Sequence, residues 1–536
     1  MLRLGGPING GPAAASTAGP GTVWMVPLGN NSYTGRTLVA SADGNGSDGI
    51  LQVSGFSSSV IPGGLDIGQG TSNTTSPTRP QVQALTGNVI SDTTQVNLAA
   101  DGLLVLNGFS ETIAQLTGTG SVSFPSSLFT LTIGDAGNFT FGGIISGAGN
   151  VNKVGIGTMT YTAANTYTGQ TRVSGGTLLL SAPAGTGAIK GPLTIGLGVG
   201  APNTATVQLG NGNQISNTTL PITINSDGKL DTGTFVESVG PVTINGGNFV
   251  LGGSVQQFDG LTMNGGTISG AGTLLLRASN VVATATAAFG VATINANVEL
   301  SFAPDETITV NSGSAQPELT INGIVSKVVG PTNLIKTGTG TLRLAGSAAN
   351  TYGGSTTIER GVLELGKAAG ITAITGPIVI GNGTDAAGSA ALKNLARFQI
   401  GGAPLMTINA SGVYEINPNA QASRLETIGG LTGSGSLVMN TGPQLNIDVA
   451  SGATYTYSGT ITSPSVNGAT AIVKVGAGEQ ALSGTSPTYA GQLLVSSNSG
   501  VLRIDGDLRS AFTGVNPGAT IGGTGRIANM LGSGGT

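Results

Sequence analysis

The stretch Asn165-Thr-Tyr-Thr-Gly-Gln-Thr-Arg-Val-Ser-Gly-Gly-Thr-Leu-Leu-Leu180 decides the fold of this 536-residue chain, because related stretches recur elsewhere in it. These are Asn31-Ser-Tyr-Thr-Gly-Arg-Thr-Leu-Val39, Asn350-Thr-Tyr-Gly-Gly-Ser-Thr-Thr-Ile358 and Pro487-Thr-Tyr-Ala-Gly-Gln-Leu-Leu-Val495. With their flanking strands they form copies 1 to 4, at residues 17–53, 153–180, 336–365 and 474–504. Repetition of this kind predicts a unit that stacks on its own copies.

Copies 1 to 3 contain an Asn-x-Tyr-x-Gly signature and copy 4 keeps its Tyr and Gly after Pro487; we interpret the signature as a tightly packed turn and not as a ligand site. The tyrosines lie too far apart in the chain to form one platform for a ligand. The signature residues are Asn31, Tyr33, Gly35, Asn165, Tyr167, Gly169, Asn350, Tyr352, Gly354, Tyr489 and Gly491.

A Gly-x-Gly pair stands before each signature, and in three copies a lysine lies two residues ahead of it. These lysines are Lys153, Lys336 and Lys474, and Thr17 holds the position in copy 1. We expect the lysines at solvated strand edges. The Gly-x-Gly pairs are interpreted as turns and not as dinucleotide-binding loops, because no helical pattern follows them.

Each copy closes with a short strand whose second and fourth positions are always aliphatic. Alternation of this kind predicts that these two positions face a core and that the third position faces solvent. The predicted inward residues are Leu51, Val53, Leu178, Leu180, Leu363, Leu365, Leu502 and Ile504, and the outward ones are Gln52, Leu179, Glu364 and Arg503.

Two further motifs recur between the copies. One begins with Glu-Thr-Ile, at Glu111–Gly120 and Glu426–Gly435; the other is Gly-Pro-aliphatic-x-Ile-Gly, at Gly191–Gly196 and Gly376–Gly381. The signature tyrosines are 134, 185 and 137 residues apart, so we expect an insertion of about 50 residues within 235–300. The predicted organisation is one solenoid over 1–536, with repeat units 17–144, 145–323, 324–460 and a partial unit 461–536.

The composition favours an all-β protein. Gly is very abundant (93 residues), only 8% of residues are charged, and the 38% hydrophobic fraction excludes a disordered chain. Short strands separated by glycine turns fit a sandwich, a barrel or a solenoid. A solenoid is favoured because no linker interrupts the 536 residues and because coils tolerate insertions. We predict a parallel β-helix with about 20 coils of roughly 20–25 residues each.

The chain is poor in catalytic chemistry. It contains no Cys and no His, which excludes Ser-His-Asp and Cys-His nucleophiles and ordinary zinc sites. Asp43, Asn45 and Asp48 imitate the start of a calcium loop but lack its glutamate, so we interpret them as a turn and a weak metal candidate. With Asp66, Asp43 and Asp48 are also the best carboxylates for a carbohydrate-active enzyme. We expect no enzyme activity and no cofactor.

The net charge of −4 and the scattered basic residues argue against nucleic-acid binding, and no apolar run is long enough to span a membrane. Met1-Leu-Arg-Leu-Gly-Gly-Pro lacks the apolar region of a signal peptide. Three alternatives therefore stay open: the mature chain starts here, the chain is a fragment, or export uses another route.

At Gly-x-Gly-Thr-Leu followed by Asn-Thr-Tyr-Thr-Gly-x-Thr-x-Val-x-x-Gly-Thr-Leu, the sequence resembles the autotransporter-associated β-strand repeat. The resemblance is close in copies 2 and 3 and weaker in copies 4 and 1. It implies a right-handed β-helix of the kind found in passenger domains of bacterial autotransporter-type surface proteins, with an extracellular or cell-surface address. The membrane barrel of that family is not visible, so we interpret the chain as a passenger-like rod without its translocator.

Three functions are compatible with these observations. The leading hypothesis is a non-catalytic extracellular structural protein that associates with itself, end to end, into a fibre or surface layer. The alternative is an adhesin or surface stalk that binds a host or matrix surface through loops such as 41–49 or 68–80. The third is a carbohydrate-active β-helix enzyme, which needs converging carboxylates.

Overall fold

The computed structural model describes most of the chain. The described residues are 2–4, 16–17, 22–25, 31–40, 49–55, 60–70, 79–215, 219–253, 255–276, 281–300, 304–327, 329–416, 424–440, 442–463, 470–510, 512–527 and 530–532. Asp43, Asn45 and Asp48, the weak metal candidates, lie outside them, as does most of the loop 41–49.

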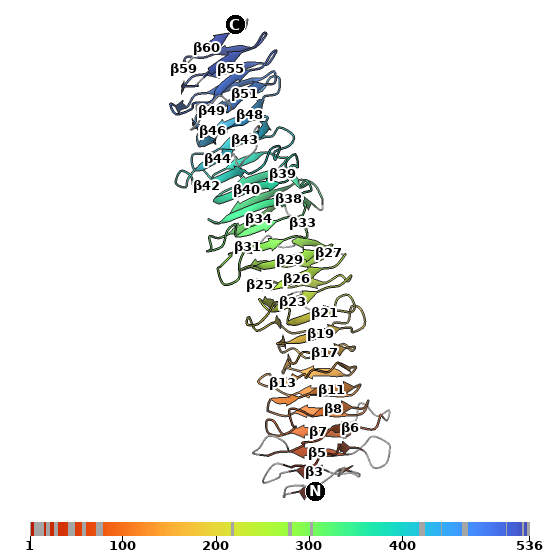
Figure 1. The fold of residues 1–536 in the computed structure, drawn as a ribbon. Coiled ribbons are helices and arrows are strands. Elements are labelled where there is room, and N and C mark those ends of the chain that lie inside the picture. The colour runs from red at the N-terminus through yellow and green to blue at the C-terminus, as the bar shows by residue number, and fades with distance from the viewer. Residues whose placement is uncertain are drawn as a thin grey trace. The chain divides into compact units, whose positions relative to one another are not determined.

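Every regular element in the described residues is a β-strand, and neighbouring strands pair in parallel within a solenoid (Figure 1). The predicted fold, an all-β right-handed parallel β-helix of about 20 coils, is therefore confirmed, with about 19 turns. None of the described segments is a helix that could cross a membrane. The chain divides into two compact units, residues 1–259 with 269–272, and residues 260–268 with 273–536.

In unit 1 the strands form three parallel ladders, which the chain visits in the order 1, 2, 3. Ladder 1 consists of β10 (Glu111–Ile113), β13 (Thr130–Ile133), β16 (Asn150–Lys153), β18 (Thr171–Val173), β20 (Leu193–Ile195), β22 (Ile222–Asn225) and β25 (Val242–Asn245). Ladder 2 consists of β2 (Ser16–Thr17), β4 (Thr37–Val39), β6 (Leu65–Ile67), β8 (Gln95–Leu98), β11 (Gln115–Gly118), β14 (Phe139–Phe141), β17 (Thr158–Tyr161), β19 (Gly176–Leu180), β21 (Ala205–Leu209), β23 (Gly228–Asp231) and β26 (Asn248–Leu251).

Ladder 3 of unit 1 is interrupted. Its first part consists of β1 (Leu2–Leu4), β3 (Thr22–Met25), β5 (Ile50–Val53), β7 (Gln81–Ala84), β9 (Leu103–Leu106), β12 (Ser121–Phe124) and β15 (Ile144–Gly147). Its second part consists of β24 (Ser238–Val239) and β27 (Val255–Phe258).

Unit 2 has the same three-ladder plan. Ladder 1 consists of β28 (Leu261–Met263), β31 (Val281–Ala283), β34 (Asp305–Val310), β37 (Thr332–Thr337), β39 (Gly353–Ile358), β41 (Ile378–Ile380), β43 (Leu405–Ile408), β46 (Gly430–Gly433), β49 (Thr454–Tyr457), β52 (Glu479–Leu482), β55 (Val501–Ile504) and β58 (Thr520–Gly522). Ladder 2 consists of β29 (Gly266–Gly270), β32 (Ala292–Ile294), β35 (Leu319–Ile321), β38 (Thr341–Gly346), β40 (Gly361–Lys367), β42 (Ala390–Asn394), β44 (Gly412–Ile416), β47 (Ser436–Met439) and β50 (Thr460–Thr462), beside which lie β53 (Thr485–Ser486), β56 (Asp507–Leu508) and β59 (Arg526–Ile527).

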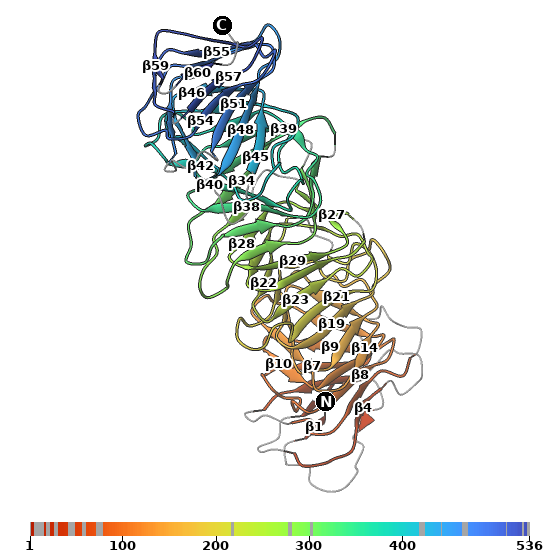
Figure 2. The same cartoon turned by 45° about the horizontal axis from the view of Figure 1, so that its top comes forward.

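Ladder 3 of unit 2 also has two parts. The first consists of β30 (Thr273–Leu276), β33 (Asn297–Leu300) and β36 (Val325–Lys327). The second, whose strands lie side by side in Figure 2, consists of β45 (Arg424–Ile428), β48 (Pro443–Asp448), β51 (Ala471–Val475), β54 (Gln492–Val495), β57 (Phe512–Val515) and β60 (Met530–Gly532).

The closing strands of the copies place the expected aliphatic residues in the core. In copy 2, Leu178 pairs with Met159 on one neighbouring strand and with Val207 on the other, and all three are buried. Leu179 between them is only partly buried. Like residues thus stack over like residues, coil after coil, because each strand presents alternate side chains to the interior. All the predicted inward residues are buried: Leu51, Val53, Leu178, Leu180, Leu363, Leu365, Leu502 and Ile504.

Glycines occupy positions where the next coil passes too close for a side chain. A Cβ at Gly169 would lie 2.2 Å from the carbonyl oxygen of Gly149, and one at Gly354 would lie 2.1 Å from that of Thr332. Gly176 also has a left-handed φ of 64°, which is costly for other residues. The signature glycine is therefore explained by coil-to-coil contact.

Candidate functional site

The signature asparagine is buried and joins three successive coils. Asn165 accepts a hydrogen bond from the backbone N–H of Ile145 (2.9 Å) and donates one to the carbonyl of Ala188 (3.0 Å). Asn350 does the same with Val325 (2.9 Å) and Ala373 (3.0 Å). Buried backbone groups need such partners wherever a ladder is interrupted. Asn31 of copy 1 likewise donates to the carbonyl of Val60, at 2.6 Å.

The signature tyrosines fill the interior at the same corner, as expected for a turn-packing role. In copies 1 to 3 the hydroxyl of each tyrosine pairs with the threonine four residues later, at 2.7 Å for Tyr33, 2.5 Å for Tyr167 and 2.6 Å for Tyr352. The pairing satisfies two polar groups that burial removes from water. These tyrosines are inaccessible to a ligand.

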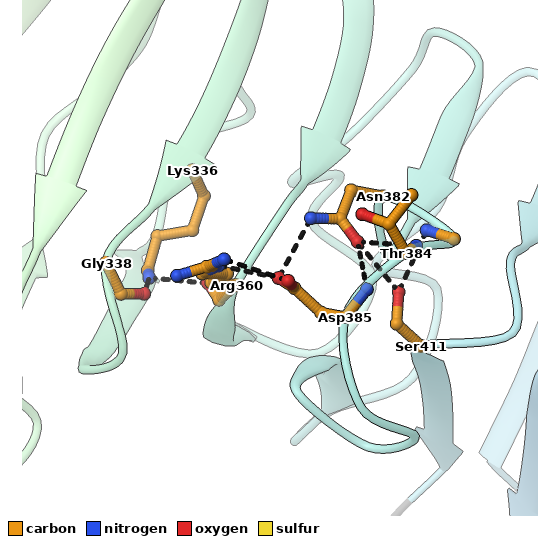
Figure 3. A network of polar contacts seen from close by, with 8 residues as sticks. Lys336, Gly338, Arg360, Asn382, Thr384, Asp385 and Ser411 are labelled. Carbon is orange, nitrogen blue, oxygen red and sulfur yellow. Dashed lines mark hydrogen bonds and ion pairs between the residues drawn. The ribbon is translucent and has the colours of Figure 1, made fainter.

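The three lysines correct the prediction that they lie at solvated strand edges, because Lys153, Lys336 and Lys474 are fully buried. The Nζ atom of Lys336 donates to the carbonyls of Thr337 (2.8 Å), Gly338 (2.8 Å) and Arg360 (2.9 Å), as Figure 3 shows in part. Gly-x-Gly corners leave carbonyls pointing inward, and an ammonium group satisfies three of them at once. No sequence signal distinguished this inward lysine from an outward one except its strict spacing from the glycines.

Burial alters the protonation of these lysines. It lowers the pKa of Lys153 to about 8 and that of Lys336 to about 7, because the charged ammonium loses its hydration. The pKa of Lys474 is lowered for the same reason. These shifts follow from structural burial and from no arrangement with a nearby nucleophile, so they carry no catalytic implication.

The recurring Glu-Thr-Ile motif has a structural explanation that sequence reasoning missed. The carboxylate of Glu426 accepts the backbone N–H groups of Gln399 (2.9 Å) and Ile400 (3.0 Å) in the preceding coil. Glu111 bridges Val89 and Ile90 in the same way. We call such a carboxylate, which accepts two successive backbone N–H groups, a carboxylate fork. Each fork lies where the pairing of neighbouring coils is reduced to an isolated β-bridge. Burial raises the pKa of Glu111 to about 8 and that of Glu426 to about 7.

Glu237 is a third carboxylate fork, which no repeated sequence motif announced. It accepts the N–H groups of Gln214 (2.8 Å) and Ile215 (3.1 Å), and burial raises its pKa to about 7. Glu111, Glu237 and Glu426 therefore all bind the backbone of a neighbouring coil.

The Gly-Pro-aliphatic-x-Ile-Gly motif ends in a turn whose backbone N–H groups hold a side chain from the next coil. Asp227 accepts N–H bonds from Leu197 (3.0 Å) and Gly198 (2.7 Å). In unit 2, Ser411 takes this place beside Gly383 and also donates to Asn382 (Figure 3). These turns, with their glycines, are anion-holding nests already occupied by the protein itself.

Outward carboxylates form ion pairs with neighbours in the same ladder or the next turn. Arg360 binds Asp385 through two hydrogen bonds of 2.6 and 2.8 Å (Figure 3), and Arg36 holds Asp66 in the same bidentate way. The Arg36 guanidinium holds the pKa of Asp66 below its usual value. Asp66, one of the three carboxylates considered for catalysis, is thus held in an ion pair with Arg36. Within the described residues, no cluster of three or more carboxylates suited to a metal ion is found.

The repeat copies occupy different ladders in the two halves of each unit. In unit 1, copy 1 starts in ladder 2 and copy 2 starts in ladder 1. In unit 2, copy 3 starts in ladder 1 at β37, whereas copy 4 starts in ladder 3 at β51. The contact of the buried lysine with the first glycine carbonyl of the Gly-x-Gly pair is kept in copies 2, 3 and 4 while the face of the solenoid changes, so the copy is a local module.

Comparisons with known proteins agree with this architecture. The model of the passenger-associated-transport-repeat family matches residues 151–180, 334–365 and 472–504, which nearly coincide with copies 2, 3 and 4. Over 211 residues, 39% of this chain, the sequence is 30% identical to the adhesin BmaC autotransporter of Brucella suis biovar 1 (strain 1330). The aligned part is 5% of that much longer relative. No solved structure matches.

Proposed function

We propose that this chain, three of whose repeat copies match the passenger-associated-transport-repeat family, is displayed outside a bacterial cell as a non-catalytic solenoid whose outer surface adheres to a host or matrix surface. The observation that carries the proposal is the 30% identity to an autotransporter adhesin over 211 residues.

The interior supports a scaffold role. The buried Lys, Glu, Asn and Tyr side chains of the repeats all bind the backbone or side chains of their own or adjacent coils. None of these groups reaches the surface, so they hold coils together and leave recognition to outward positions. The outward positions also vary most between the copies, which is where specificity is expected in a repeat scaffold.

The surface chemistry supports adhesion more than catalysis. In ladder 2 of unit 2, the outward residues Arg343, Glu364, Lys393 and Glu415 stand in register with alternating charge. Two of the pairs are direct ion pairs, Arg343 with Glu364 (2.7 Å) and Lys393 with Glu415 (3.1 Å). Carboxylates paired in this way are poorly placed to act as general acid and base.

Adhesion of beads coated with the purified chain to layers of mammalian cells and extracellular matrix tests the proposal. We expect attachment that the soluble folded chain inhibits and that the heat-unfolded chain does not inhibit. Attachment no greater than that of albumin-coated beads would contradict the proposed function.

Self-association into a fibre stays a second proposal, which rests on the tendency of stacked parallel strands to extend a ladder. Electron microscopy of the purified chain distinguishes it from single display. Filaments are expected if the fibre proposal is right, and isolated particles at high concentration would exclude it.

A further inference from the structure

A shallow pocket lies on the outer surface of ladder 1 in unit 1, over the strands β13, β16 and β18. Its volume is about 240 Å³, and it is lined by Thr130, Asn150, Val151, Asn152, Gln170 and Arg172. Three successive coils contribute to it, because Thr130 pairs with Asn150 and Asn152 pairs with Arg172 in the parallel register. Apart from Val151, the lining side chains carry amides, a hydroxyl and one guanidinium.

Arg172 differs from four other outward arginines of the chain in its partners. Arg36, Arg343, Arg360 and Arg503 each hold a carboxylate in an ion pair. The register neighbours of Arg172 are instead Asn152 and Thr194, and among the described residues no carboxylate pairs with it. Its guanidinium is exposed at the pocket with all its donors available.

The repeat itself does not require this arginine. The positions of Asn152 and Arg172 are taken by Ile335 and Thr357 in copy 3. In copy 4, Val473 and Leu494 take the same two places. The copies fold with these residues, so neither coil stacking nor turn geometry explains Asn152 and Arg172.

Asn150, in contrast, has a role that the repeat keeps. It accepts the backbone N–H of Gln170 at 2.8 Å, and its counterpart Asn333 accepts that of Ser355 at 2.9 Å. The pocket therefore combines a structural asparagine, shared by copies, with two polar residues particular to copy 2.

The hydrogen bonds around the pocket orient its polar groups. Ser174 donates to the Oδ1 atom of Asn152 at 2.7 Å, which turns the Asn152 amide nitrogen into a donor for a ligand. Gln170 donates its amide nitrogen to Thr194 at 3.0 Å, which leaves its Oε1 atom as an acceptor. The pocket thus offers the positive charge of Arg172, neutral donors on Asn152 and Thr130, and an acceptor on Gln170.

We propose that this pocket binds a carboxylate-bearing sugar residue of an acidic polysaccharide, with Arg172 and Asn152 as its main contacts. This proposal rests on the proposed adhesive function. A guanidinium matches a carboxylate in bidentate geometry. The surrounding amides and hydroxyls match the hydroxyl groups of a sugar ring. A pocket of 240 Å³ is smaller than the roughly 300–1,000 Å³ typical of sites for drug-sized ligands, which suits a single residue.

The same face offers a path for further residues of a polysaccharide. The column of Arg172 continues along ladder 1 with Thr194, Thr223 and Thr243, in register and roughly 4.8 Å apart. An acidic peptide fits less well, because peptides add to a free strand edge or place side chains in apolar pockets, and the strands here are paired on both sides.

Calorimetric titration of the full chain with trigalacturonate tests the proposal, with its methyl-esterified form as the neutral control. We expect trigalacturonate to bind at least tenfold more tightly than the ester. Arg172→Thr, which introduces the residue of copy 3, should weaken binding at least tenfold, and Arg172→Lys should weaken it less. Arg343→Ala, in the charged ladder of unit 2, should leave binding unchanged.

Three results would overturn the proposal: equal binding of the ester, equal affinity for a triglutamate peptide, or unchanged affinity in Arg172→Thr with its hydrogen-exchange pattern intact. The bead assay separates the two proposals. Adhesion that survives Arg172→Thr refutes the pocket and keeps the adhesive function. Loss of adhesion by every form of the chain, with trigalacturonate still bound through Arg172, refutes the adhesive function alone.

Discussion

Copies 3 and 4 of the repeat lie in the same unit but are built on different faces of the solenoid. The first strand of copy 3, β37, belongs to ladder 1, and that of copy 4, β51, belongs to ladder 3. The second strand of copy 4, β52, takes the place in ladder 1 that the first strand holds in copy 3. The repeat therefore keeps the corner between its own strands, whichever face of the solenoid those strands form.

The polar partners of the two copies also differ. Copy 4 has Pro487 where copy 3 has Asn350, and the Oγ atom of Ser486 accepts the N–H of Ile461 at 2.8 Å instead. Leu493 replaces the threonine partner of the tyrosine, so the hydroxyl of Tyr489 donates to the carbonyl of Gln492 at 2.5 Å. Side chains changed while the buried backbone groups and hydroxyls kept partners, because an unpaired one is costly.

The lysine that closes the Gly-x-Gly corner gives the largest expected difference between the copies. Lys336→Met leaves three carbonyls without a donor, and Lys474→Met leaves two. We expect the free energy of local opening to fall by about 3 kcal/mol in the first variant and about 2 kcal/mol in the second. Hydrogen exchange of residues 334–365 and 472–504 measures both, and a loss below about 0.5 kcal/mol in either would contradict the corner's role.

The pH dependence should have opposite signs at copy 3 and at the Glu426 fork between the copies. The pKa of Glu426 is raised to about 7, so its stabilising contribution is complete below about pH 4.5 and is lost as the pH rises through 7. The pKa of Lys336 is lowered to about 7, so its contribution is complete above about pH 10.5 and is lost as the pH falls through 7.

Hydrogen exchange at several pH values, corrected for intrinsic rates, measures these two contributions. Between pH 5 and pH 8 the amides of Gln399 and Ile400 should lose protection, by on the order of 2 kcal/mol. Around Gly338, where Lys336 binds the backbone carbonyls, the protection of the amides against exchange should rise from pH 7 to pH 10. The variants Glu426→Gln and Lys336→Met are the controls, and an unchanged pH profile in either would contradict the assignment.

The tyrosine hydroxyls should matter less than the lysines. Tyr352→Phe leaves the buried hydroxyl of Thr356 unpaired, so we expect a loss of about 1.5 kcal/mol. The double variant with Thr356→Val should recover part of it, because both partners are then apolar. A double variant no more stable than the single one would show that the pair is not coupled.

The smallest effect is expected at the surface. Arg343→Ala removes an ion pair with Glu364 whose arginine side chain is 36% exposed. Such pairs contribute about 0–1 kcal/mol, and salt weakens them. Thermal unfolding with and without 0.5 M salt checks this; a loss above about 2 kcal/mol would mean that the alternating charges, and not the buried polar groups, fix the register.

The sequence predicted the solenoid, its parallel ladders and the inward leucines such as Leu363, because alternation repeated over four copies reports which side faces the core. It also identified Tyr352 as a turn residue. It did not predict the burial of Lys336 or the fork of Glu426, because charged residues are rarely buried and their partners are backbone atoms of other coils. The aligned copies place Arg172 opposite Thr357, but only the structure shows that Arg172 lines a pocket beside Asn152 and Thr194.

Cysteine pairing tests most directly whether copy 4 has moved to another face, and the chain's lack of native cysteine makes the test clean. In the structure Thr456 of β49 stands opposite Ala481 of β52, and Val473 of β51 lies in ladder 3. Neighbouring strands lie within the Cα separation of about 4.4–6.8 Å that a disulfide needs. We expect Thr456→Cys with Ala481→Cys to oxidise readily in the folded protein, and Thr456→Cys with Val473→Cys to stay reduced. The reverse outcome would show that copy 4 keeps the faces of copy 3 and would contradict the modular account of the repeat.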